Sequence, residues 1–168
     1  TVIAIIGILA AILVPVAGKA RETALRRRAA AEMNSIKVAV LQFQADHRYM
    51  PWGDPENKTE ARVGADVWTT DVSNHELLMR WLTGENPLKK NYLQIPEKSR
   101  PDDKSLVFID PWKKPYMVGL DRNLDGAVTV VGSDSSWDNK TVMERVLVYS
   151  KGDPETDPLK RLKTFDVP

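Results

Sequence analysis

Residues 1–18 form one uncharged, mostly apolar run, and this run constrains the fold more than any other feature of the chain. As a helix it reaches roughly 27 Å, close to the ~30 Å hydrocarbon core of a bilayer. A basic stretch follows at once, whereas a signal peptide carries its charges first and ends in a cleavage site. We therefore expect the run to be retained in the working protein, as a transmembrane helix over residues 1–25.

The helical pattern continues beyond the apolar run. Residues 20–49 contain no Gly or Pro, and apolar side chains recur at spacings of three and four, which is typical of one buried helix face. A helix from Thr1 to about Tyr49 is roughly 73 Å long, so its second half is expected to dock on a globular head. Pro15 is expected to kink the first half. The recurring apolar residues are Ala29, Met33, Ile36, Val40 and Phe43.

The rest of the chain has the size and composition of one ordinary globular domain. The whole chain of 168 residues is 42% hydrophobic and 28% charged, which argues against disorder. A net charge of +1 gives no basic field, so no nucleic acid partner is expected. The absence of cysteine excludes disulfides, thiolate metal sites and cysteine nucleophiles.

Turn residues and short β-type runs divide the head, residues 26–168. Variable loops are expected over 50–105, with a short helix capped by Ser73 and Glu76 and stopped by Gly84. A β-sheet is expected over 106–150, and an irregular tail over 151–168. The predicted fold is α+β: a long N-terminal helical stalk, half membrane-spanning and half amphipathic, packed on a small head with a second helix and a C-terminal antiparallel sheet. The expected strands are 92–95, 106–109, 116–120, 127–131 and 142–149.

Residues 2–15, Val-Ile-Ala-Ile-Ile-Gly-Ile-Leu-Ala-Ala-Ile-Leu-Val-Pro, resemble the N-terminal helix of type IV pilins and type II secretion pseudopilins. Two further segments resemble the major pseudopilin branch: residues 43–51, which are similar to the motif that closes its long helix, and residues 148–152. A third, Asp-Pro-Trp-Lys-Lys-Pro-Tyr at 110–116, is similar to the Asp-Pro-Trp-Gly-x-Pro-Tyr of that branch, with Lys113 in place of glycine. The Phe-Thr-Leu-Ile-Glu-type segment that precedes the helix in the family is absent, so we expect the chain to begin inside the mature N-terminus. Residues 54–100 resemble nothing known.

The resemblance implies a structural subunit without enzymatic turnover. Its N-terminal helix would wait in the bacterial inner membrane as a single span, with the head in the periplasm or outside, and then enter a filament core. The implied partners are copies of the same chain, an inner-membrane assembly platform, minor pilin-like subunits and, before assembly, the lipid bilayer. The positive-inside rule alone would place the head in the cytoplasm; we follow the resemblance.

The polar loop at 121–127 is the strongest chemical signal in the head. Oxygen side chains alternate at Asp121, Asn123 and Asp125, followed by Gly126, as in the first half of an EF-hand-type calcium loop. Gly132 stands where the bidentate Glu would be, so the loop is not a complete EF-hand. Major pseudopilins bind calcium near their C-terminal loops, and the resemblance therefore implies a structural Ca²⁺. The alternative is a polar β-turn without metal. The candidate ligands are Asp121, Asn123, Asp125 and the carbonyl of Ala127, completed by Asp134, Asp138 or Asp153.

Catalytic motifs are absent from the sequence. The two histidines, His47 and His75, stand outside any metalloprotease pattern, and we expect both at the surface. No catalytic or cofactor-binding residue is predicted beyond the calcium loop. Three functions stay open: a major-pseudopilin-like subunit for type II protein secretion, a type IV pilin of an adhesion or DNA-uptake pilus, and a membrane-anchored enzyme or binding module.

Overall fold

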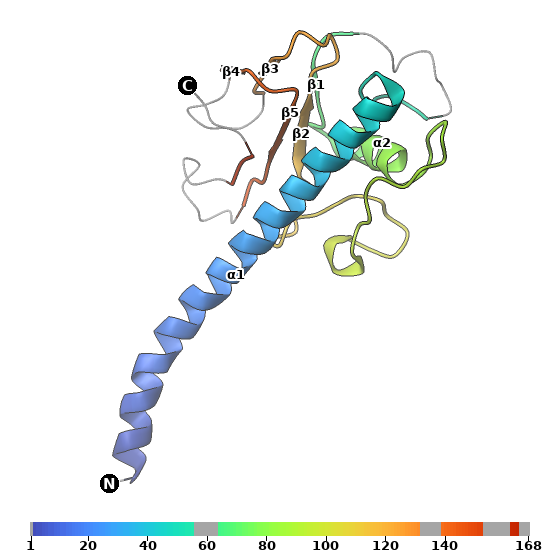
Figure 1. Cartoon of the computed structure of the whole chain (residues 1–168). Helices are drawn as coiled ribbons and strands as arrows, with labels where there is room; N and C mark the ends of the chain where they lie inside the picture. Colours follow the sequence, from blue (N-terminus) through green and yellow to red (C-terminus); the bar gives the residue numbers. More distant parts are fainter. Residues whose placement is uncertain (1, 56–63, 132–138, 153–161, 165–168) are drawn as a thin grey trace.

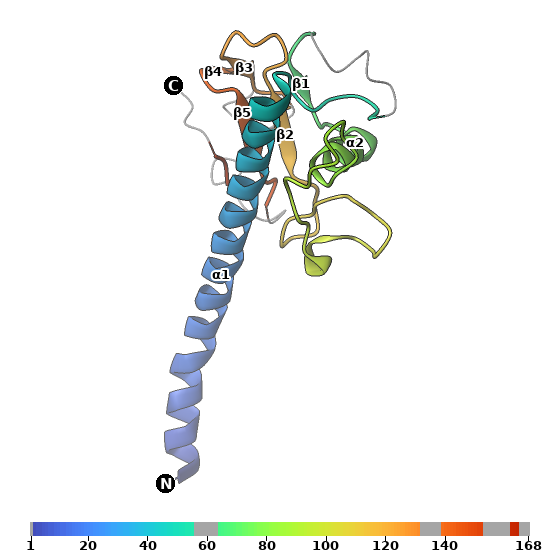
Figure 2. The same cartoon turned by 45° about the vertical axis from the view of Figure 1, so that its right-hand side comes forward.

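The chain folds as a long N-terminal helix joined to a mixed head. The computed structural model describes residues 2–55, 64–131, 139–152 and 162–164, with side chains from Gly18 onward. Figure 1 shows the long helix, a second helix and antiparallel strands, so the predicted α+β class is confirmed. The second half of the long helix lies against the head, and its first half projects away from it (Figures 1 and 2).

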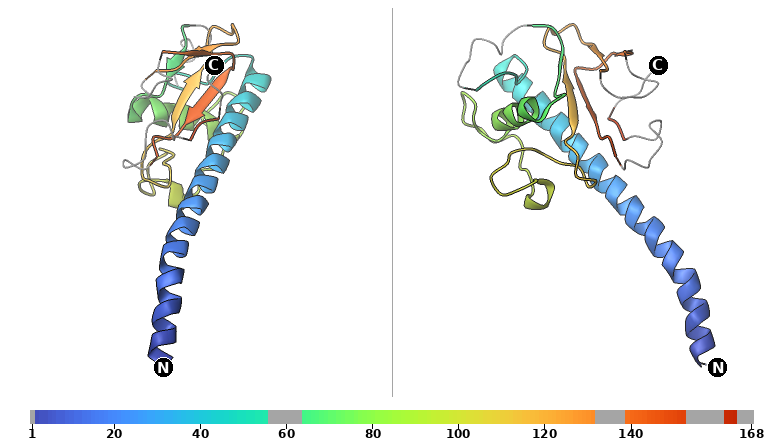
Figure 3. Two further views of the ribbon diagram at one scale, coloured as in Figure 1. Left: turned by 90° about the vertical axis from the view of Figure 1, so that its left-hand side faces the viewer. Right: turned by 180° about the vertical axis from the view of Figure 1, so that it is seen from behind.

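Helix α1 spans Val2–His47 and stays helical across Pro15, with a gentle bend in its N-terminal half (Figure 3). Its last residue is His47, two residues before the predicted end at Tyr49. The next residue, Arg48, has a left-handed backbone (φ 65°) that stops the helix. All five apolar residues predicted to recur on its inner face are buried. This apolar stripe of α1 packs into the core of the head.

Helix α2 (Val72–Leu82) exists as predicted but begins differently. Its N-cap is Asp71, whose carboxylate accepts a hydrogen bond from the N–H of Asn74 at 2.8 Å, so the predicted cap at Ser73 is wrong. Both residues are of the N-cap type, and α2 begins at Val72, so Asp71, two residues before Ser73, takes the role. Gly84, at φ 116°, stops the helix as predicted.

The strands of the described residues form two antiparallel sheets. One sheet has the order β1–β2–β5, where β1 is Val67–Trp68, β2 is Met117–Leu120 and β5 is Val146–Tyr149. The other pairs β3 (Val128–Thr129) with β4 (Thr141–Val142). β1 was not predicted, and the expected strands at 92–95 and 106–109 are wrong. Among the described residues the first takes part in no ladder, and the second contributes only the bridge of Ile109 to Pro115.

The main core lies where α1 crosses the three-stranded sheet and meets α2 (Figure 3). Phe43 of α1 and Trp81 of α2 meet edge to face, with ring centroids 5.6 Å apart. Trp68 of β1 belongs to a second cluster beside Tyr149. The first ring pair joins α1 to α2, and the main core around it includes Val118 and Val148 of the sheet, so the head is fixed to the second half of α1.

Candidate functional site

The loop between β2 and β3 carries the predicted metal ligands. Asp121 is fully buried, and its two carboxylate oxygens accept hydrogen bonds from the N–H groups of Asp125 (3.2 Å) and Gly126 (2.9 Å). The Oδ1 of Asn123 accepts from the N–H of Asp125, and the Oδ1 of Asp125 accepts from the N–H of Ala127. The loop thus folds around its own acidic and amide side chains, as Asx turns do.

The backbone N–H groups hold these side-chain oxygens in place but do not occupy all of their lone pairs. A carboxylate has about four lone-pair sites, so an oxygen that accepts one N–H can still coordinate a cation. Over the described ranges of the chain, however, no group of three or more His, Cys, Asp or Glu side chains could hold a metal ion. The predicted ligands Asp134, Asp138 and Asp153 lie outside the described residues. The structure therefore brings four of the predicted ligand residues into one loop without a complete ligand set.

Asp66, which was not predicted, lies beside the same loop. It accepts hydrogen bonds from the backbones of Arg122 and Asn123, while its Oδ1 is buried and finds no partner among the described residues. Burial raises the pKa of this carboxyl, and the charges of Asp121 and Asp125 raise it further. The charges of Asp121 and Asp125 therefore act on Asp66, although these three carboxylates do not form a group that could hold a metal ion. No local pattern marks Asp66, because it belongs to a stretch that reads as a polar loop.

The segment at 110–116 folds on the carboxylate of Asp110. Its Oδ1 accepts the N–H groups of Trp112 and Lys114, both at 2.9 Å, and its Oδ2 accepts the Ser150 hydroxyl at 2.6 Å. Asp110 is buried, and this burial raises the pKa of its carboxyl. Ser150 lies in residues 148–152, so this hydrogen bond joins segment 110–116 to the end of β5.

Glu32 joins α1 to the head through a buried polar cluster. Its carboxylate accepts the hydroxyl of Tyr116 at 2.6 Å, the hydroxyl of Ser99 at 2.8 Å and the Nε of Arg28 at 2.8 Å. Because three donors from three parts of the chain share one carboxylate, this contact fixes where the head sits along α1. The sequence pattern places Glu32 on the polar side of the helix and gives no sign of this role.

The two histidines differ from each other in position. His75 is fully buried, so the expected surface position is wrong: the inner face of α2 includes it together with Leu78 and Met79. Its Nε2 accepts the N–H of Phe108 at 3.1 Å, and burial lowers the pKa of His75 to about 4. His47 is partly exposed and stacks on Phe43. His75 thus has a backbone partner in Phe108, and His47 an aromatic partner in Phe43.

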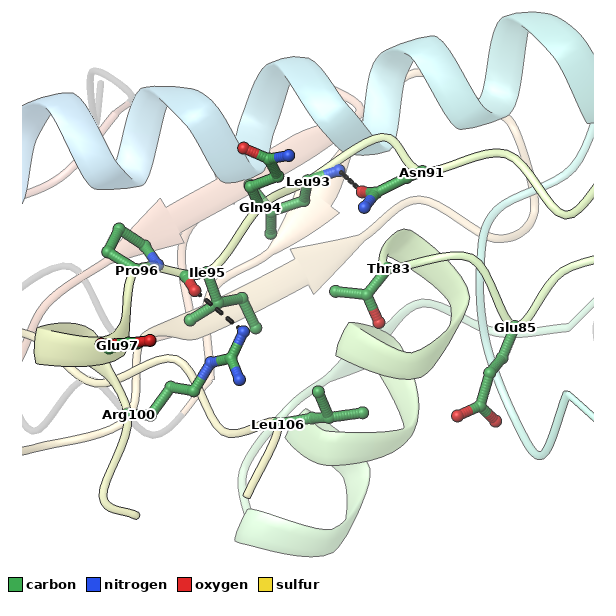
Figure 4. Close-up of a pocket in the computed structure, with 10 residues that line it drawn as sticks. All are labelled: Thr83, Glu85, Asn91, Leu93, Gln94, Ile95, Pro96, Glu97, Arg100 and Leu106. Carbon is green, nitrogen blue, oxygen red and sulfur yellow. Dashed lines mark hydrogen bonds between the residues drawn. The ribbon is translucent and has the colours of Figure 1, made fainter. Parts of the chain in front are cut away.

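A groove of about 840 Å³ opens beside the C-terminal end of α2. Figure 4 shows its walls: Thr83 at the end of α2 lies on one side together with Leu106, and segment 91–96 lies on the other, followed by Glu97 at the start of a 3-10 helix (Glu97–Ser99). Glu85 and Glu97 lie at opposite ends, and Arg100 projects into the space between them. This groove falls within and just after the stretch that resembles nothing known.

The described part of the chain contains no helix that is both long enough and apolar enough for a membrane crossing. Residues 2–17, most of the predicted segment 1–25, are described only as helical backbone.

Comparisons with protein-family models, with curated proteins and with solved structures found no match. A functional proposal therefore depends on the residues and geometry of the chain itself.

Proposed function

We propose that this chain is a structural subunit of an extracytoplasmic pilus-like filament, similar to a major pseudopilin of type II protein secretion. The observation that carries the proposal is the shape of α1. Its second half supplies one side of the head core, while its first half, which contains the apolar run, projects away from the head (Figures 1 and 2). An apolar helix without cover from its own domain needs lipid or other helices around it.

The small residues of the apolar run support close packing between copies of the helix. Gly7, Ala10, Ala11, Ala17 and Gly18 lack bulky side chains, which lets helix backbones approach each other in an apolar environment. In this proposal the helix spans the inner membrane before assembly and enters the filament core afterwards. An assembly platform and minor pilin-like subunits would move it from one place to the other.

The proposal predicts that one charge in the apolar run prevents assembly without unfolding the head. We would compare Ile8→Asp with Thr70→Asp, which puts the same charge at an exposed position of the head. The expected result is loss of sedimenting filaments from cells for Ile8→Asp alone, with equal melting temperatures for both variants. Normal filaments from Ile8→Asp would contradict a helix-packed core.

The type IV pilin alternative can be distinguished by the other proteins that the filament requires. Filaments that require a secretion channel and support protein export fit the pseudopilin proposal. Filaments that extend and retract with a retraction ATPase, and that bind surfaces or take up DNA, would favour the pilin. A discrete, active monomeric head without filaments would favour the anchored enzyme or binding module.

We also propose a structural Ca²⁺ in the loop at 121–127. The support is the buried, unpartnered Oδ1 of Asp66 beside Asp121 and Asp125, together with the loop's oxygen-rich side chains. The ion would pin the loop and add to the stability of the head. The test is a melting curve of the full chain in calcium and in chelator, with Asp121→Asn as the ligand variant. Identical curves in both solutions would rule the ion out.

A further inference from the structure

We propose that two different surfaces of the head bind each other between copies of this chain: a groove beside the end of α1 in one copy receives the outer side of α2 from the next copy. This inference rests on the proposed filament and deepens it, because it names a contact between the heads. Two different surfaces of one chain form a head-to-tail contact, which can repeat along an open helical filament.

The groove lies between the last turns of α1 and the loop at 121–127, and it has a volume of about 380 Å³. Two of its lining side chains are exposed leucines, Leu41 at 36% and Leu124 at 42%. Val38, about one turn before Leu41 on α1, is 51% exposed and extends this apolar surface. The lining residues are Leu41, Gln44, Ala45, Arg48, Leu124 and Arg145. Apolar side chains gathered at one surface are typical of a site that another protein covers.

Leu124 holds a backbone conformation that leucine rarely adopts. Its φ is 62°, in the left-handed region, where the Cβ of an L-residue is crowded and glycine or asparagine fits better. Because much of its side chain is exposed, packing within its own chain does not account for a leucine at this position. An apolar contact with a partner does account for it, since strained residues gather at binding sites.

Two guanidinium groups flank these leucines. Arg48 and Arg145 are exposed, and neither side chain forms a hydrogen bond or ion pair among the described residues. The neighbouring carboxylates are already engaged: Glu144 pairs with Lys37, and Asp125 accepts hydrogen bonds within its own loop. The groove therefore suits a partner surface that brings an apolar side chain and two negative charges.

The outer side of α2 has the matching chemistry. Val72 is 54% exposed, and Glu76 follows one turn later on the same side of the helix, without a hydrogen bond or ion pair within the described ranges. After a further turn, the Nε of Arg80 lies 2.7 Å from Oε2 of Glu85, and its Nη1 lies 3.7 Å from Oδ1 of Asp54. This side of α2 thus carries three carboxylates and one guanidinium, which leaves two negative charges in excess.

The two surfaces belong to different sides of one head. The inner side of α2 is packed into the core, so its outer side faces away from its own groove. In the left view of Figure 3, α2 lies on one side of the head and the end of α1 on the other. The two surfaces can therefore meet only between copies. Lys114 and Lys151 line a small hollow with Asp71 and Val72, so we assign the ion pairs to Glu76 and not to Asp71.

A charge exchange tests the contact in cells that assemble the filament. Arg145→Glu alone and Glu76→Arg alone should each lower the yield of sedimenting filaments at least ~10-fold, because each places like charges opposite one another. The double variant should recover most of the natural yield. Lys104→Glu makes the same change of charge at an exposed lysine outside both surfaces and should leave the yield unchanged. Equal melting temperatures of the full chains would exclude unfolding as the cause.

Leu124→Gly separates binding from folding. Glycine suits the left-handed backbone, so this variant should melt at a higher temperature than the natural chain. It loses the apolar contact between copies, however, and should lower the filament yield at least ~10-fold. An unchanged yield would mean that Leu124 makes no contact with a second copy and would overturn the assignment of the groove.

Engineered cysteines report the contact directly, because the natural chain contains none. In intact filaments, Leu124→Cys combined with Val72→Cys should give covalent ladders of many copies with a short thiol-specific crosslinker. Leu88→Cys combined with Val72→Cys, which uses an exposed leucine outside the groove, should not. Filaments that give no ladder, or no recovery in the charge exchange, would overturn this contact and leave the filament proposal standing. A natural chain that forms no filaments would overturn both.

Discussion

Lys113 holds a backbone conformation that suits glycine, so Lys113→Gly should stabilise the head. Its φ is 68°, in the left-handed region, and its N–H closes the tight turn by donating to the carbonyl of Asp110 at 3.0 Å. The side chain is exposed and forms no hydrogen bond or ion pair among the described residues. The substitution therefore changes the backbone preference and removes no contact.

The size of the effect follows from two opposing terms. A left-handed conformation costs an L-residue roughly 1–2 kcal/mol. Glycine, in turn, loses about 0.5–1 kcal/mol more conformational entropy on folding than alanine does. The balance is a gain of about 1 kcal/mol in the free energy of unfolding, which corresponds to about 2–4 °C in melting temperature for a domain of this size.

Urea and thermal unfolding of three proteins would measure it: the natural chain, Lys113→Gly and the control Lys113→Ala. Alanine removes the same long charged side chain but keeps the left-handed strain, so it should melt close to the natural chain. If glycine and alanine give the same stability, the backbone of Lys113 is not strained and the reasoning fails.

Three further substitutions have defined outcomes. Glu32→Ala leaves the buried Tyr116 hydroxyl without its acceptor and should cost about 1–3 kcal/mol in urea unfolding, with Glu32→Gln milder. The lowered pKa of His75 means that its neutral form stabilises the fold, so this contribution is complete above about pH 6.5 and falls by about 3 kcal/mol as pH drops toward 4. His75→Gln should lack this part of the acid sensitivity in unfolding measured at both pH values. Gly119→Ala would place a methyl group against the Trp68 ring and should lower the melting temperature, whereas no change would mean that β1 is not packed there.

Helices were the most predictable part of the chain because their signals are local. The spacing from Ala29 to Phe43 identified the inner face of α1, and the stop at Gly84 fixed the end of α2. The cap of α2 was misplaced because Asp71 and Ser73 are both good N-cap residues and local chemistry does not choose between them.

The strands were less predictable because pairing depends on distant partners. Val67–Trp68 forms β1 through its register with β2, where Trp68 lies opposite Gly119. The β-type residues 92–95 form no ladder within the part of the chain that the structure describes, and nothing in their sequence reveals whether an edge will be paired.

In the candidate site, too, the residues that are close in sequence were predicted and those that only the fold brings together were not. The spacing of Asp121, Asn123 and Asp125 predicted one loop of converging oxygens, because those residues are close in sequence. Asp66 reaches the loop only through the fold, so no motif could include it. Likewise, the burial of His75 depends on which side of α2 meets the core.

Electron cryomicroscopy of the full chain, expressed together with an inner-membrane pilin assembly platform, tests the central claim most directly. The filament proposal predicts helical fibres in which residues 1–18 of neighbouring copies pack along the axis and the heads cover the surface. Dispersed single heads without fibres, or fibres with the heads at the axis, would contradict it.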